Sequence, residues 1–377
     1  MEVITRQMET NEVAKKLIDQ FVLDEDFNVP DSKNDVEKIV LSQGNVRIDE
    51  VKPVENYIRV QGAVYFHVLY VAEGYEPSFS CMESKIPFVE MVYAEDDGRH
   101  HFDVMQADVE LGVSMVHSRK LRLKAMVELG LEAKEQRVQE IPSDVSADCA
   151  IYKKQKEMEL LKLCVSKKDT YRIKEELSLP GTKESMSMML WSDIANRRLD
   201  TRLAVDELQL TGELLVFCFY ESPDGKIDWV EQAIPYQGRV DCYGVDDTMY
   251  HHVQANLEDV HADMRVDEDG EMRIIGIEGT LKLYIEIYEE EKMDVLEDVY
   301  SLEKNYIPKM EEVSYEQLVL QNQSKCKVME RLSIPELRNE VLQICHSSGT
   351  IRIDRMDKRE DGIYVEGALY IRFLYVK

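Results

Sequence analysis

Residues 58–70 read IRVQGAVYFHVLY, and this stretch decides the fold class. From Ile58 to Tyr70 every second residue is apolar, apart from Gly62 within the series. Successive side chains of a β-strand point to opposite faces, so a period of two predicts a strand. A glycine inside so long a strand marks a bend, a bulge or a close backbone approach, which would let the sheet curl over its core.

The same stretch occurs three times. Residues 208–220 read LQLTGELLVFCFY and residues 363–375 read IYVEGALYIRFLY. In each copy the glycine lies 32 residues after a proline and eight residues before a tyrosine; the three sets are Pro30, Gly62 and Tyr70, then Pro180, Gly212 and Tyr220, then Pro335, Gly367 and Tyr375. The copies are offset by 150 and 155 residues, far more than the repeat of a solenoid, so the pattern predicts tandem domains.

We therefore divide the chain into a first copy (residues 1–150), a second copy (151–310) and a third unit (311–377) that is the start of a third copy. Residues 44–49 match 349–354, whereas the second copy at 196–200 lacks the glycine and is one residue out of step. Strand-like runs at 121–131 and 274–287 and acidic turns at 95–98 and 267–270 complete the pattern. The best helical candidate, Tyr152 to Cys164, lacks a firm helical period. The predicted fold is mainly β, with tandem β-sandwich or partly open barrel domains, two complete and one incomplete.

Composition restricts the class of protein and of partner. A length of 377 residues excludes a single small module. A hydrophobic content of 44% excludes intrinsic disorder. The formal net charge of −28 argues against a nucleic acid or an anionic membrane as the main partner. The first copy carries −13, the second −14 and the third unit −1. The nearly neutral third unit is thus the better candidate for close packing, although solubility alone also explains the acidity. Neither a signal peptide nor a spanning apolar run is visible, so we expect the protein to act where it is made.

The motifs around these strands resemble the SPOCS domain, formerly DUF3794. The resemblance is carried by the leader DEDFNVPDS at 24–32, by KDTYRIKEELSLPGTK at 168–183 and by LDTRL at 199–203. It covers essentially the whole chain, and the arrangement is most similar to the SpoIVA-interacting protein and its LysM-bearing homologues of clostridia. These motifs are structural signatures, with no catalytic residue among them.

The resemblance implies a non-enzymatic morphogenetic scaffold of the bacterial spore envelope. Such a scaffold is made in the cytoplasm of the mother cell and links the coat to the forespore surface by binding stage IV sporulation protein A, a coat ATPase. In the family this contact lies in a LysM domain, which is missing from these 377 residues, so no binding residue can be carried over. Two alternatives stay open: a self-assembling layer protein of the spore surface, and a carbohydrate or cell-wall binding module. The second would need a row of exposed aromatics, hinted at by Tyr65, Phe217 and Tyr370.

Several histidines and one cysteine are candidates for chemistry, and for each the ordinary interpretation is favoured. The pairs His100-His101 and His251-His252 resemble metal ligands. If they lay in strands, however, the two neighbours would point to opposite faces, and both pairs lie in polar, turn-like surroundings. We therefore expect solvated loop histidines. His67 lies on the less apolar strand face and predicts a surface role. Cys345-His346 could be a nucleophile with its base, but sequence neighbours rarely have that geometry. We predict no catalytic, cofactor-binding or metal-binding residue, no nucleic-acid partner and no membrane insertion.

The remaining motifs carry no chemistry either. The loop at 267–270 fails as a calcium site, because Arg265 and Gly276 stand where ligands are required. Nucleotide, zincin and hydrolase motifs are missing from the sequence. Trp191 and Trp229 are expected as core or edge aromatics. The seven cysteines show no metal or redox spacing and are mostly expected as reduced core thiols; they are Cys81, Cys149, Cys164, Cys218, Cys242, Cys326 and Cys345.

The third unit is shorter than its counterparts. The first copy continues for about 65 residues after Tyr70, whereas only Val376 and Lys377 follow Tyr375. The sequence therefore predicts a truncated form of a longer protein. A β-domain interrupted there would expose apolar side chains such as Phe373, and it would exchange its amide hydrogens fast or associate with itself.

Overall fold

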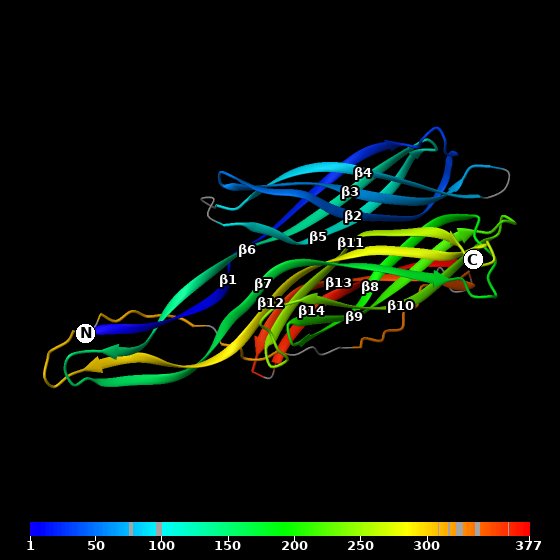
Figure 1. Cartoon of the computed structure of the whole chain (residues 1–377). Helices are drawn as coiled ribbons and strands as arrows, with labels where there is room; N and C mark the ends of the chain where they lie inside the picture. The colour runs from blue at the N-terminus through cyan, green and yellow to red at the C-terminus, as the bar shows by residue number, and fades with distance from the viewer. Residues whose placement is uncertain are drawn as a thin grey trace.

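The computed structural model describes residues 1–74, 78–95, 100–307, 309–315, 317–321, 327–335, 340–360 and 362–377. Its elements are fourteen β-strands (Figure 1). In chain order they are β1 (Glu2–Asn28), β2 (Val36–Val54), β3 (Tyr57–Ala72), β4 (Ser78–Tyr93), β5 (Phe102–His117), β6 (Lys120–Ser146), β7 (Tyr152–Ser178), β8 (Met188–Ala204), β9 (Glu207–Glu221), β10 (Ile227–Asp241), β11 (Tyr250–Val266), β12 (Met272–Tyr300), β13 (Gln343–Arg359) and β14 (Gly362–Val376). The predicted mainly β fold is confirmed, and Tyr152 to Cys164, the best helical candidate, is strand.

The first copy is a sandwich of two three-stranded antiparallel sheets. One sheet has the order β1-β6-β5 and the other β2-β3-β4. The alternating face of β3, from Ile58 to Tyr70, packs against the alternating face of β6, from Leu121 to Ala133, and both are buried. Burial of these two stripes removes a large apolar area from water and holds the sheets together. The core face predicted from the period of two is confirmed.

The second copy repeats this architecture. Its sheets have the orders β11-β12-β7 and β10-β9-β8, and β9 packs on β12 as β3 packs on β6. In the described part of the chain no sheet closes into a barrel, so the sandwich form of the prediction holds. The described residues also include no helix with the length and apolar character needed to cross a membrane.

The repeated glycine is explained by close approach. A Cβ on Gly62 would lie 2.4 Å from the carbonyl oxygen of Arg47, and one on Gly367 would lie 2.3 Å from that of Arg352. In the second copy the space is filled differently, since a Cβ on Gly212 would lie 2.0 Å from the ring of Tyr236, its cross-strand partner. The predicted close backbone approach is confirmed for the first and third glycines, and the second accommodates an aromatic ring instead.

The hairpins that contain these glycines have the same register in the first and third units and nearly the same register in the second. Tyr70, Tyr220 and Tyr375 pair with residues 39, 189 and 344, and each pair is followed by a register shift across one residue. A second shift lies at residue 49 in the first hairpin and 354 in the third, but at 197 in the second. The second copy is therefore one residue out of step between these points, as expected from its missing glycine. The glycine strands occupy equivalent places in the three hairpins, as predicted.

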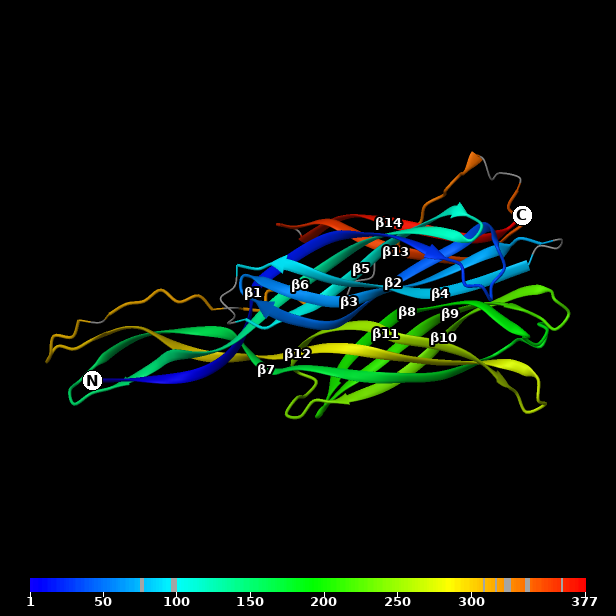
Figure 2. The same ribbon diagram turned by 90° about the horizontal axis from the view of Figure 1, so that it is seen from above.

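The longest strands extend beyond the sandwiches and form an arm. Residues 2–16 of β1 pair with 132–146 of β6, and residues 152–165 of β7 pair with 287–300 of β12. Figures 1 and 2 both show these four strands projecting together from the body, with the N-terminus beside them. The two hairpins pack through one apolar cluster: Met8, Ile141, Leu160, Met293 and Val295. The arm thus joins the first copy to the second.

The third unit contributes the hairpin β13–β14, which lies beside the sandwiches in Figure 2. Residues 307–333 stand 155 positions after β7, but the described residues of this range form no strand. The apolar face of β14 is largely exposed, including Ile363, Val365, Leu369 and Phe373, because no described sheet covers it as β12 covers β9. The expected exposure of Phe373 is confirmed.

Candidate interaction surfaces

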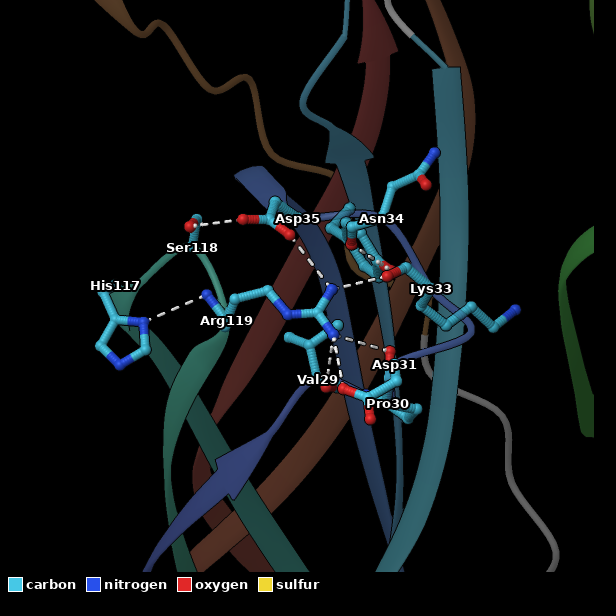
Figure 3. Close-up of polar contacts among 10 residues, drawn as sticks. Val29, Pro30, Asp31, Lys33, Asn34, Asp35, His117, Ser118 and Arg119 are labelled. Carbon is cyan, nitrogen blue, oxygen red and sulfur yellow. Dashed lines mark hydrogen bonds and ion pairs between the residues drawn. The ribbon is translucent and has the colours of Figure 1, made fainter.

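A clamp of arginine and backbone carbonyls fixes the loop after Pro30. Arg119, in the turn between β5 and β6, donates from its guanidinium to the carbonyl oxygens of Val29 (3.2 Å), Pro30 (3.1 Å) and Lys33 (2.6 Å), and to Asp35 (3.1 Å) (Figure 3). The planar guanidinium offers five donors, so one side chain can satisfy several carbonyls of a tight loop. The clamp ties the loop that connects β1 to β2 to the turn of the β5–β6 hairpin.

The second copy uses the same device. Arg273 donates to the carbonyl oxygens of Pro180 (3.0 Å) and Lys183 (2.8 Å). The repeated tyrosines add a contact to the same loops, because Tyr70 donates to the Asn34 carbonyl and Tyr220 to the Glu184 carbonyl. The proline and tyrosine that reveal the repeat therefore serve the fold, and this region is a structural device.

The outer faces of the hairpins meet at a second apolar cluster, here called the three-copy junction. Its members come from β3, β8, β9 and β13, with partly buried neighbours on β2, β4, β10 and β14; the buried residues are Leu69, Leu190, Trp191, Phe217, Phe219 and Cys345. Phe79 of the first copy packs edge-to-face on Phe219 of the second, with ring centroids 5.3 Å apart. All three units thus contact one another through the faces that point away from their own cores.

Asp193 is the polar centre of the junction. Its Oδ1 accepts a hydrogen bond from Gln43 of the first copy at 3.3 Å, and its Oδ2 lies 2.9 Å from Nε2 of His346 in the third unit. The other ring nitrogen of His346, Nδ1, lies 2.6 Å from Oε2 of Glu231. The imidazole stacks on Phe217 with centroids 4.2 Å apart, and it is buried. One histidine of the third unit is therefore held in a socket that belongs to the second copy.

The electrostatics of this socket favour the charged pair. Burial alone would lower the pKa of His346, but the hydrogen bonds to Asp193 and Glu231 and the charges of these carboxylates raise it above the ordinary value. Burial alone would raise the pKa of Asp193, but hydrogen bonds from His346 and Gln43 and the imidazolium charge lower it. Both shifts have the sign expected of a salt bridge shielded from water.

The two complete copies also share a polar contact at the base of the arm. Glu286, which is buried, accepts hydrogen bonds from Asn11 and from the ammonium of Lys134, both at 2.6 Å. This contact borders a cavity of about 280 Å³ that His101, Asp103 and Lys168 also line. Lys168 is paired with Asp103, as Lys134 is with Glu286. The charges around the cavity are thus matched between the copies, which favours an interface over an anion site.

The two histidine pairs considered in the sequence as metal ligands, His100-His101 and His251-His252, do not come together at one site. His101 is exposed beside Asp103, and His100 lies 4.0 Å from Glu135. The loop placement is wrong for the second pair, because His251 and His252 lie in β11 and point to opposite faces; His251 is half-buried, contacts Thr201 at 2.9 Å, and burial lowers its pKa. Among the described residues no group of three or more His, Cys, Asp or Glu side chains could hold a metal ion.

His67 keeps its surface role, with a contact of 3.3 Å to Glu83. Cys345 and His346 are not engaged with each other: the imidazole faces two carboxylates, and burial raises the pKa of the thiol. Trp191 is buried in the junction and Trp229 packs beside it, as expected of core aromatics. Of the described cysteines, Cys218, Cys242 and Cys345 are buried and Cys81, Cys149 and Cys164 are partly buried, all as free thiols; Cys326 lies outside the described residues, as does most of the 95–98 turn.

The hint of an aromatic row is wrong. Phe217 is fully buried against His346, whereas Tyr370 is 58% exposed on the third hairpin, so the row is interrupted at its centre. Sequence reasoning missed the junction, although a signal for it exists. Residues 214–220 of β9 read LLVFCFY, apolar on both faces, and such a run indicates a strand buried on both sides.

These features define a class: a protein of tandem β-sandwich domains whose outer sheet faces serve as contacts between domains. Comparison with known families makes the class specific. A family model described as SipL, SPOCS domain matches residues 35–118 and 185–265. One stretch in each complete copy thus matches the SPOCS domain, as the sequence motifs predicted, and this domain indicates a sporulation-related protein. No curated protein and no solved structure matches it.

Proposed function

We propose that the protein is a non-enzymatic scaffold of the spore envelope, which links coat assembly to the forespore surface through protein–protein contacts. The single observation that carries this proposal is the use of outer sheet faces as contact surfaces. In the first two copies these faces are covered at the three-copy junction. The match to the SPOCS domain supports a role in sporulation. The contacts between sheet faces support a role as a scaffold that acts through protein–protein contacts.

The hairpin β13–β14 is the surface that this scaffold offers to a partner. Its exposed apolar side chains include Ile351 (73% exposed), Leu369 and Tyr370, and contiguous exposed apolar side chains mark interaction sites. The third unit is nearly neutral, so a partner meets little of the charge that surrounds the first two copies. The partner implied by the SPOCS resemblance is stage IV sporulation protein A, and the hairpin would bind it in addition to the LysM contact known for the family.

The experiment is binding of the purified 377-residue chain to purified stage IV sporulation protein A, measured by biolayer interferometry. The double variant Leu369→Ser/Tyr370→Ser should weaken binding at least tenfold. The matched control Met115→Ser/Val116→Ser alters two exposed apolar residues of β5 and should leave binding unchanged. Equal binding by both variants would place the contact elsewhere, and no binding by the wild-type chain would contradict this choice of partner.

Self-assembly is the second candidate, and the same exposed hairpin favours it. Two hairpins could cover each other's apolar faces, because large exposed apolar patches favour association. Sedimentation velocity separates this function from the first. Self-assembly predicts a molecular mass that rises with protein concentration. If the Leu369→Ser/Tyr370→Ser variant removes this increase, self-assembly is supported over binding of a different partner. A carbohydrate-binding role loses its main support with the burial of Phe217.

A further inference from the structure

We propose that His346 is a proton-dependent latch that holds the third unit on the second copy. The latch consists of the His346 imidazole and the socket formed by Asp193, Glu231 and Phe217. It is a feature of the chain itself and does not rest on the proposed function. Proton binding at one side chain would then decide whether the β13–β14 hairpin is docked or free.

The positions of the two ring nitrogens require the proton. Nδ1 lies 2.6 Å from a Glu231 oxygen and Nε2 lies 2.9 Å from an Asp193 oxygen. A neutral imidazole has one N–H, so one nitrogen would direct a lone pair at a carboxylate oxygen. The imidazolium donates from both nitrogens, and both hydrogen bonds are then charge-assisted. Both contacts are therefore favourable in the protonated state alone.

The surroundings make this contact matter for docking. Asp193 comes from β8, Glu231 from β10 and the stacked Phe217 ring from β9, while His346 is the polar residue of β13 buried among them. Gln43 of β2 reaches the imidazole only through Asp193, and the β14 partner of His346 is the apolar Leu374. The neighbouring Cys345 thiol stays protonated, because burial raises its pKa. No other described titratable group contacts the ring.

The sign of the pH dependence follows from the two shifts. The pKa of His346 is raised in the folded chain, so its contribution is complete below the ordinary value of 6.5 and is lost as the pH rises through the folded-state pKa. The pKa of Asp193 is lowered, so its contribution is present above the ordinary value of 3.8 and is lost as the pH falls through the folded-state pKa. The latch is therefore closed in mildly acidic solution and opens as the solution becomes alkaline.

The test has two readouts on the full 377-residue chain. A histidine titration by NMR, with the His346 ring signal assigned through its connection to the backbone of the same residue, should give a midpoint above pH 6.5 that Asp193→Asn lowers. Hydrogen exchange, corrected for the intrinsic rate, should show protection of residues 343–359 falling at least tenfold from pH 6 to pH 8.5. In His346→Gln the protection should be low at both pH values, and the exposed-histidine control His252→Gln should behave as wild type.

A His346 midpoint at or below 6.5 would overturn the latch, even if the His346→Gln variant did not fold. Protection of the hairpin that is independent of pH in the wild-type chain would also overturn it. The same would follow if His346→Gln kept the wild-type pH dependence, because another group would then control docking.

Discussion

Arg119 and Arg273 show how one residue type can hold a repeated loop. Arg119 lies in the turn before β6 and Arg273 at the start of β12, and each guanidinium satisfies carbonyl oxygens of the loop that leads into the other sheet. A loop crossing between sheets has no ladder to satisfy its backbone groups, so a side chain must do it. The same argument applies to Asn34 and Glu184, whose carbonyls accept from the repeated tyrosines.

Replacing Arg119 by Lys should therefore lower the free energy of unfolding by about 2 kcal/mol, because a single ammonium cannot reach the three carbonyls and the charged hydrogen bonds that are lost are strong ones. Urea unfolding followed by fluorescence measures it. Arg273→Lys should act similarly in the second copy. The control Arg122→Lys changes an exposed pair with Asp24 and should have little effect. Equal effects of all three changes would contradict the clamp.

Gly62 is the residue at which the close approach can be tested. Gly62→Ala would place a Cβ 2.4 Å from the Arg47 carbonyl oxygen, a backbone atom that cannot move without disturbing the ladder. We expect a loss of about 1–3 kcal/mol of stability, as for other overpacked sites. Gly112→Ala is the matched control, because its nearest atom lies 3.8 Å away. A Gly62→Ala protein as stable as this control would show that the glycine has another role.

At the scale of the element, the limits of sequence reasoning follow from what a local pattern encodes. The strand β3 was predictable, because its core stripe from Ile58 to Tyr70 alternates without interruption. The pairing of β1 with β6 was not, since the two strands lie about a hundred residues apart and many solvated charges interrupt their pattern. The socket of His346 was even less predictable. A period of two shows that one face of a strand is apolar, but it does not show which element packs on that face.

Residues 307–333 carry the prediction that belongs to this scale. Their counterpart β7 is held on one side by β12, and a strand is stable only with such a ladder partner. The described residues of 307–333 have none, so their amides should exchange within seconds. Residues 165–178 of β7 should stay protected for at least a hundred times longer. Hydrogen exchange with mass spectrometry compares the two directly, and similar protection would mean that the range forms a strand.

For the whole molecule, two separate apolar clusters join the complete copies. The arm packs through Met8 and its apolar neighbours beside the Lys134–Glu286 pair, and the three-copy junction packs through Phe219 and Phe79. Each contact restrains the rotation that the other would allow. Both copies carry a large negative charge, so these contacts act against a mutual repulsion.

The final prediction is that the two copies unfold as one cooperative unit. Calorimetry should show a single transition for them, with calorimetric and van't Hoff enthalpies equal. The double variant Met8→Ser/Lys134→Met removes the apolar centre of the arm and leaves Glu286 without its cation, which is costly for a buried carboxylate. The transition should then separate into two, whereas the control Val138→Ser, at an exposed position of the same arm, should keep it single. Two transitions in the wild-type chain would mean that the copies are stable independently, and that the arm and the junction orient them without stabilising them.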